Sequence, residues 1–435
     1  MRNLLRSFAL LGGALLCTVT GYTQRYLSDY DSTLFIIDTL RTVVKRFENL
    51  HIGAYMQPQY QVTSEKGANS FAGGNFQDMA DNRFMLRRAR VKIDYRLPGK
   101  DGSFPLALFT FQFEATERDM NVRDVFVRIY EPGSHAFSLT AGLFARPFGY
   151  EVNLSSSVRE SPERGRMSQT LMPSERDLGA MVSYEQQHPK GKGPQLKFDV
   201  GLFNGQGKSG PAEFDSYKDL ISRLGLKPYK LGGGLTLSAG LSYLNGGWAR
   251  GNRFSYRMGE KGGDPVFAVD SNLSNIGTKA ERRYYGGDVQ LALEHGWGKT
   301  EIRGEYWRGK QPGTASSTVN PGTLPEAPTY VRPFDGAFFY FLQNIVNEKW
   351  ELIVKYDWYD PNRLAKGAQI GKAGTNLTPG DIRYNTLGAG LTRHLTPTLK
   401  LLVYYDAVRN EKTLLPGFTE DLEDNVLTCR IQMRF

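Results

Sequence analysis

The stretch KWELIVKYDWY, from Lys349 to Tyr359, alternates between two kinds of side chain. Successive side chains of a β-strand point to opposite faces, so one face is aromatic and aliphatic and the other mostly charged. The first face holds Trp350, Leu352, Val354, Tyr356 and Trp358, and the second holds Lys349, Glu351, Ile353, Lys355 and Asp357. A Lys or Arg at a lipid midplane costs roughly 2–4 kcal/mol, which gives this strand a fixed orientation between hydrocarbon and water.

The same alternation recurs along the chain after residue 50. In RRARVKIDYRL, Val91 and Ile93 share one face, and Arg88, Arg90 and Lys92 share the other. We predict sixteen such strands, beginning near His51, Phe84, Pro105, Val122, Ala136, Leu178, Gln195, Lys218, Gly234, Tyr284, Lys299, Phe334, Lys349, Ile382, Thr398 and Asp424. Their lengths of roughly 9–13 residues exceed the five or six of ordinary strands and suit tilted strands that cross a bilayer.

The connections between these strands alternate in length. Turns such as PGKDGS and EPGS are short, whereas residues 62–83, 145–177 and 246–283 form long loops. Outer-membrane barrels have short turns at one end and long loops at the other. An unpaired N–H or C=O in hydrocarbon costs several kcal/mol, so the sheet must close on itself. The sequence therefore predicts an all-β fold, a 16-stranded antiparallel transmembrane β-barrel over residues 51–435.

The N-terminal region differs from the barrel. Residues 1–24 have Arg2 and Arg6 before a short apolar core, which predicts a cleaved signal peptide and export. Lipid attachment at Cys17 is the alternative. Residues 25–50 contain STLFIIDTLRTVVKRFENL, whose apolar residues have helical spacing. We expect an amphipathic helix that packs on the same chain or a membrane surface, or that self-associates as a short coiled coil.

Charge and residue types exclude several classes of function. The formal charge of +9 becomes +7 when Arg2 and Arg6 are removed, and both signs are interspersed. That mixture disfavours binding to nucleic acid and suits a surface or lumen that handles ions. Four of the five histidines lie in or beside the short turns, and no glycine-rich stretch matches a phosphate loop. We expect no enzyme activity, no cofactor and no metal site.

The third long loop is rich in arginine. It includes Arg146, Arg159, Arg164, Arg166 and Arg176. By fold-level analogy with sixteen-stranded porins, a loop in this position folds inward and narrows the pore. Its guanidinium groups would then join Arg88, Arg90 and Lys92 around an anion-binding constriction. The alternative is that these arginines are solvated and paired with Glu151, Glu160, Glu163 and Glu175.

Several motifs resemble the phosphate-selective porins O and P. They are GAYMQPQYQ, FMLRRARVKIDY, VRDVFVRI, AGLFARPFGYE, PSERDLGAMVSY, GLFNGQG and the terminal strand, and together they cover residues 51–435. The resemblance implies a bacterial outer-membrane porin that forms a homotrimer in the outer-membrane lipid and has a basic lumen. It also implies passive diffusion of small anions such as phosphate.

Two other functions stay open at this point. Many inward positions are acidic, namely Glu114, Glu301, Glu305, Glu351 and Asp357, which favours a general or weakly cation-preferring porin. The long outer loops would also suit a non-transporting barrel used for adhesion or scaffolding.

The chain ends LTCRIQMRF, patterned to its last residue. Leu427, Cys429 and Ile431 share a face with Phe435, and Arg430 lies opposite. We predict that this is the last strand of the closed wall and pairs with residues 53–61. Phe435 would then lie at the periplasmic aromatic girdle, and Cys429 would face lipid rather than form a disulfide.

Overall fold

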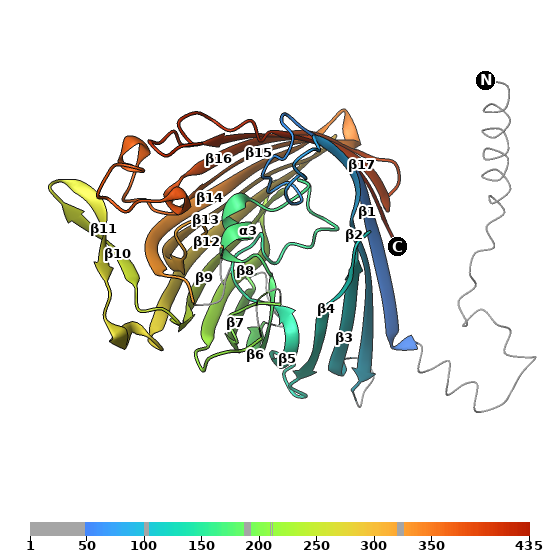
Figure 1. Cartoon of the computed structure of the whole chain (residues 1–435). Coiled ribbons are helices and arrows are strands. Elements are labelled where there is room, and N and C mark those ends of the chain that lie inside the picture. Colours follow the sequence, from blue (N-terminus) through green and yellow to red (C-terminus); the bar gives the residue numbers. More distant parts are fainter. Residues whose placement is uncertain (1–47, 100–103, 187–192, 209, 211, 320–325) are drawn as a thin grey trace, which may run out of the picture. The chain divides into compact units, whose positions relative to one another are not determined.

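We describe the protein from a computed structural model, which covers residues 48–99, 104–186, 193–208, 210, 212–319 and 326–435. The chain forms a closed barrel (Figure 1). Eighteen strands share one sheet, and two of them, β10 and β11, form a hairpin outside the wall, leaving sixteen in the wall. The wall strands are β1 (Leu50–Thr63), β2 (Asn82–Pro98), β3 (Pro105–Ala115), β4 (Met120–Tyr130), β5 (Phe137–Ala145), β6 (Arg176–Glu185), β7 (Leu196–Phe203), β8 (Asp219–Gly232), β9 (Leu235–Ala249), β12 (Lys279–His295), β13 (Gly298–Gly313), β14 (Thr329–Ile345), β15 (Asn347–Asp360), β16 (Tyr384–His394), β17 (Leu399–Asn410) and β18 (Val426–Arg434).

The pairing of first and last strands closes the barrel. β1 pairs antiparallel with β18, from Tyr55 opposite Arg434 to Thr63 opposite Val426. Neighbouring strands along the chain pair with each other, and β9 pairs with β12 across the hairpin. The predicted 16-stranded antiparallel barrel is confirmed. β12 begins at Lys279 and β14 at Thr329, each five residues before the predicted start. Both strands extend beyond the segment in which apolar side chains that face lipid alternate with polar ones.

The two faces of the wall follow the alternation of the sequence. In β18, Thr428 and Arg430 are at most 5% exposed, whereas Ile431 is 49% exposed. In β15, Lys355 and Asp357 are buried inside and Tyr356 is exposed outside. The single free cysteine of the described residues, Cys429, is half-buried on the outer face. The exterior is therefore apolar and the interior polar, as a wall between lipid and water requires.

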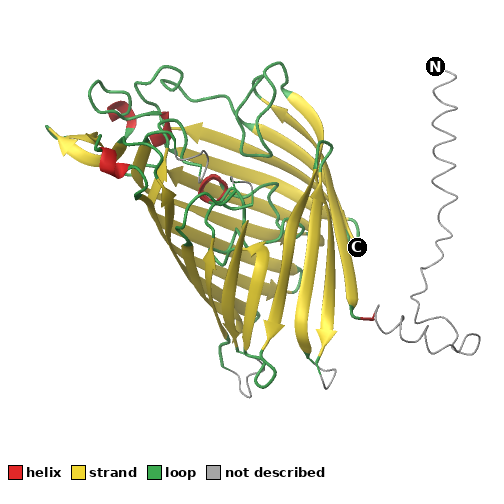
Figure 2. Cartoon of the chain, turned by 60° about the horizontal axis from the view of Figure 1, so that its bottom comes forward, coloured by secondary structure: helices red, strands yellow, loops and turns green. Residues whose placement is uncertain are grey.

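The long connections gather at one end of the barrel and the short turns at the other (Figure 2). One long connection, 250–278, contains structure that we did not predict. β10 (Ser255–Lys261) and β11 (Asp264–Asp270) form a hairpin there, and β10 pairs in parallel with β14 at Ser255–Arg257. Phe267 of the hairpin packs with Ile370 and Leu377 of the connection 361–383.

Helices are few and short. α3 (Arg166–Leu171) lies in the third long loop, and 3-10 turns η2 (Leu273–Asn275), η3 (Gly367–Gln369) and η4 (Pro379–Asp381) lie in other long connections. Among the described residues, every helix is too short to cross a membrane. The predicted signal peptide (1–24) and nearly all of the predicted helix (25–50) lie outside the described residues.

Candidate permeation site

The third long loop, residues 146–175, lies inside the ring of strands, where α3 is visible in Figure 1. An apolar cluster anchors it, in which Phe148 packs edge-on against Trp307 of β13 with ring centroids 4.7 Å apart. Met167 and Leu171 of α3 are fully buried in the same cluster. The apolar side chains of the loop are therefore packed inside the barrel as closely as those of a hydrophobic core.

Glu163 ties this loop to the wall through three arginines. Its carboxylate oxygens lie 2.8 Å from Arg87, 2.5 Å from Arg88 and 3.2 Å from Arg430. Burial alone would raise the pKa of the Glu163 carboxyl, but the guanidinium groups of Arg87, Arg88 and Arg430 hold this pKa well below its usual range. Glu163 is therefore a buried anion that neutralises part of the basic wall.

Glu175 forms the second ionic anchor. Its carboxylate is paired with Arg123, with Arg164 at 3.3 Å and with Arg176 at 2.6 Å. These guanidinium groups outweigh the effect of burial and hold the pKa of the Glu175 carboxyl well below its usual range. Elsewhere in the loop, both carboxylate oxygens of Glu160 accept hydrogen bonds from Arg303, at 2.8 and 2.9 Å.

Most of the predicted anion-binding residues are enclosed by these contacts. Five of the eight are at most 8% exposed: Arg88, Arg90, Arg146, Arg159 and Arg164. Arg90 pairs with Glu114, and the guanidinium groups of Arg146 and Arg159 donate to the carbonyls of Ser174 and Leu154. These groups stabilise the loop and have little surface left for a solute.

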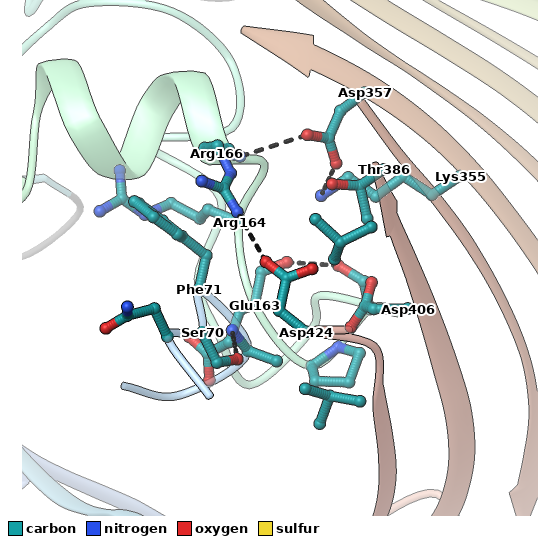
Figure 3. Close-up of a pocket in the computed structure, with 16 residues that line it drawn as sticks. Ser70, Phe71, Glu163, Arg164, Arg166, Lys355, Asp357, Thr386, Asp406 and Asp424 are labelled. Carbon is teal, nitrogen blue, oxygen red and sulfur yellow. Dashed lines mark hydrogen bonds and ion pairs between the residues drawn. The ribbon is translucent and has the colours of Figure 1, made fainter. Parts of the chain in front are cut away.

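Arg164 and Arg166 line a narrow pocket between the loop and strands β15–β18. Figure 3 shows Arg166 turned toward Asp357 and Asp424 across this pocket. The Arg164 guanidinium points away from them and donates to the carbonyls of Ser168 and Met172. Arg166 lies 3.7 Å from the Asp424 carboxylate, and its guanidinium carbon lies 3.7 Å from the Tyr384 ring centroid. The free volume is only ≈ 30 Å³, room for about two water molecules. On this side the loop seals against the wall.

On the opposite side, between the loop and the inner face of β2–β8, there is a cavity of ≈ 450 Å³, here called the lumen cavity. It is lined by five cationic side chains: Lys92, Arg128, Arg176, Lys197 and Arg223. Two carboxylates, Asp124 and Asp199, also line it. Of the eight residues predicted as a site, only Lys92 and Arg176 reach this cavity.

Four of these five cations have carboxylate partners. Arg176 lies 3.0 Å from Asp124, Lys197 lies 3.3 Å from Asp199, Lys92 lies 2.7 Å from Asp94, and Arg223 lies 2.6 Å from Asp288. Arg128 donates instead to the Thr140 hydroxyl at 2.9 Å, and within the described part of the chain it has no carboxylate within 4 Å. Arg128 is therefore the least neutralised cation of the cavity.

The barrel is similar in fold to solved outer-membrane porins. The outer-membrane channel DcaP of Acinetobacter baumannii and Salmonella typhi OmpF in complex with daunomycin each match 89% of this chain and 97% of their own. Each has a TM-score of 0.51 and 11% sequence identity, so the likeness concerns the fold. No protein-family model and no curated protein matches the sequence.

Within this porin fold, the sequence interpretation missed Arg128, Lys197 and Arg223. Alternation was the available signal: in VFVRI, Val127 and Ile129 are exposed outside, so Arg128 must point inward. The same alternation predicts that Arg223 of β8 points inward, because its neighbour Leu224 is exposed on the outside. The cations of the cavity lie mostly on the wall strands, whereas the sequence places most of the predicted site residues in the third long loop.

Proposed function

We propose that this protein is a passive diffusion channel of the bacterial outer membrane for small hydrophilic solutes. The lumen cavity carries this proposal, because it places a polar, charged space inside a closed wall whose exterior is apolar. Sixteen strands enclose enough space for water, whereas eight would be filled by side chains. The charge and apolar pattern of residues 1–24 supports export through a cleaved signal peptide. The motif resemblance supports assembly as a homotrimer.

The charge of the lumen cavity supports a mild preference for anions. Five cations and two carboxylates line it, and Arg128 has no carboxylate partner in the described chain. Guanidinium and ammonium groups lower the cost of dehydrating an anion at a constriction. Phosphate is the first solute to test, since the motifs resemble the phosphate-selective porins and an arginine can donate two parallel hydrogen bonds to one phosphate.

Reversal potentials in planar bilayers test this proposal. In a potassium chloride gradient, the purified protein should show conductance and a reversal potential that favours chloride. Arg128→Ala should lower the chloride-to-potassium permeability ratio roughly twofold. Arg253→Ala, which removes an exposed arginine of an outer connection, should leave the ratio unchanged.

A general or weakly cation-preferring porin is the second candidate, because four of the five cavity cations are ion-paired. A reversal potential that favours potassium would establish it in place of the anion preference. Absence of any conductance from folded protein would instead support a non-transporting barrel for adhesion or scaffolding.

A further inference from the structure

The outer wall of β12 and β13 carries exposed cations near the end with the long connections. Arg308 and Lys310 of β13 share the outer face with the exposed Tyr306, and Arg283 of β12 lies directly opposite Lys310. Like charges directly opposite each other on adjacent strands repel. An anion between Arg283 and Lys310 would relieve this repulsion.

These cations are less neutralised than those of the lumen. Arg283 pairs with Glu281, but Arg308 and Lys310 have neither a hydrogen bond nor an ion pair among the described residues. Asp335 of β14 stands opposite Arg308 in register and accepts a hydrogen bond from the Trp358 indole at 3.3 Å. The face therefore carries two exposed and unpaired positive charges.

An apolar groove of ≈ 520 Å³ lies on the same outer wall. Gly287 of β12 is opposite Tyr306, and Gly304 of β13 is opposite Val289, so the two glycines lie diagonally across the strand pair and leave the wall without side chains there. A Cβ added at Gly287 would have only the Leu241 side chain within 4 Å, at 3.7 Å. Leu241, Val289 and Phe339, all exposed, stand around this groove.

The basic face and the groove are spaced as the two parts of one lipid. Arg308 is four residues from Gly304 along β13, and Arg283 is four residues from Gly287 along β12, which is about 13 Å in each case. One leaflet provides about 15 Å of hydrocarbon. The exposed Tyr285 and Tyr306 lie between the two parts, at the level where aromatic girdles meet headgroups.

We infer that this face is a binding site for a phosphorylated acyl lipid, with the phosphate held by Arg283, Arg308 and Lys310 and an acyl chain in the groove. The positive charges of these three side chains favour an anionic headgroup, and the apolar side chains around the groove favour an acyl chain. This inference rests on the membrane location in the proposed function but not on conduction.

Native mass spectrometry of the purified full chain tests the inference. Lipid A, phosphatidylglycerol and phosphatidylcholine would be titrated as probes. Arg308→Gln with Lys310→Gln should weaken binding of lipid A about twenty-five-fold, because each cation near an anionic headgroup contributes about fivefold. The control, Lys230→Gln with Lys349→Gln, removes two exposed lysines near the short-turn end and should leave binding unchanged.

Gly287→Leu fills the groove without touching the cations and should also weaken binding of lipid A, while circular dichroism reports an unchanged fold. Equal binding of lipid A and phosphatidylglycerol would support a site for phosphorylated lipids with a net negative headgroup in general. Equal affinities of the charge variant and its control, or equal affinity of the native protein for phosphatidylcholine, would overturn the inference. Conductance of the same samples tests the channel separately.

Discussion

At the scale of single residues, the lumen arginines have two roles that depend on their partners. Arg88 and Arg430 converge on the buried Glu163, whereas Arg128 faces the lumen cavity and donates to a hydroxyl instead of a carboxylate. Removing one partner of a buried ion pair leaves an uncompensated charge and costs about 3–5 kcal/mol. Substitutions at the first kind of residue should therefore loosen the third loop, and substitutions at Arg128 should change selectivity.

Glu163→Gln should release the third loop, because Arg87, Arg88 and Arg430 lose their shared counter-ion. A loss of about 3 kcal/mol corresponds to roughly a hundredfold lower protection of the loop amides in hydrogen exchange. Glu420→Gln is the matched control, since Glu420 and its partner Lys412 are both exposed. Unchanged protection of residues 146–175 in Glu163→Gln would show that the apolar cluster alone holds the loop.

The pH dependence of loop docking follows from the pKa values of Glu163 and Glu175, which folding lowers. A group with a lowered pKa contributes its full stabilisation above the unfolded value, about 4.3 for Glu, and loses it as pH falls toward the folded value. The contribution of Glu163 to the protection of residues 146–175, measured as the difference between the native protein and Glu163→Gln at each pH, should therefore stay constant from pH 7 to about pH 4.5 and decline only below. A decline centred near pH 6 would contradict this assignment.

At the scale of elements, alternation predicted the wall well because lipid on one side penalises every misplaced charge. The third loop shows why the site was harder to predict. Its arginines are evident in the sequence, but Arg88 and Glu163 are 75 residues apart, and only the closed barrel shows that they meet. The hairpin β10–β11 was missed because its strands have seven residues each and pack on loops rather than on lipid.

The hairpin should be a support for neighbouring connections and not part of the wall. The Phe267 side chain is 2% exposed and packs with Ile370 and Leu377. Phe267→Ala would leave a cavity there and lower the stability of this packing by about 3–5 kcal/mol. We expect faster proteolysis within residues 361–383 and an unchanged conductance. Val269→Ala, at a position 48% exposed on the same strand, should change neither. A barrel that fails to assemble in Phe267→Ala would show that the hairpin supports the wall.

At the scale of the whole molecule, closure depends on the seam between β1 and β18. The seam pairs residues that are 363 apart (Thr63 and Val426) to 379 apart (Tyr55 and Arg434), the largest sequence separation of any strand pairing among the described residues. In hydrocarbon an open edge would leave a row of unsatisfied backbone groups. The last residue takes part: the N–H and C=O of Phe435 exchange hydrogen bonds of 3.0 Å with Ala54.

Deletion of Phe435 should therefore reduce assembly and leave the selectivity of assembled protein unchanged. The deletion removes both hydrogen bonds with Ala54 and an aromatic ring that is 78% exposed at the edge of the wall, whereas the lumen cavity lies on β2–β8. Phe435→Tyr retains the backbone bonds and the ring and should assemble normally. The fraction of heat-modifiable folded barrel in outer-membrane extracts measures assembly, and the reversal potential measures selectivity. Normal assembly of the deletion variant with an altered reversal potential would place the C-terminus in the permeation path instead of the seam.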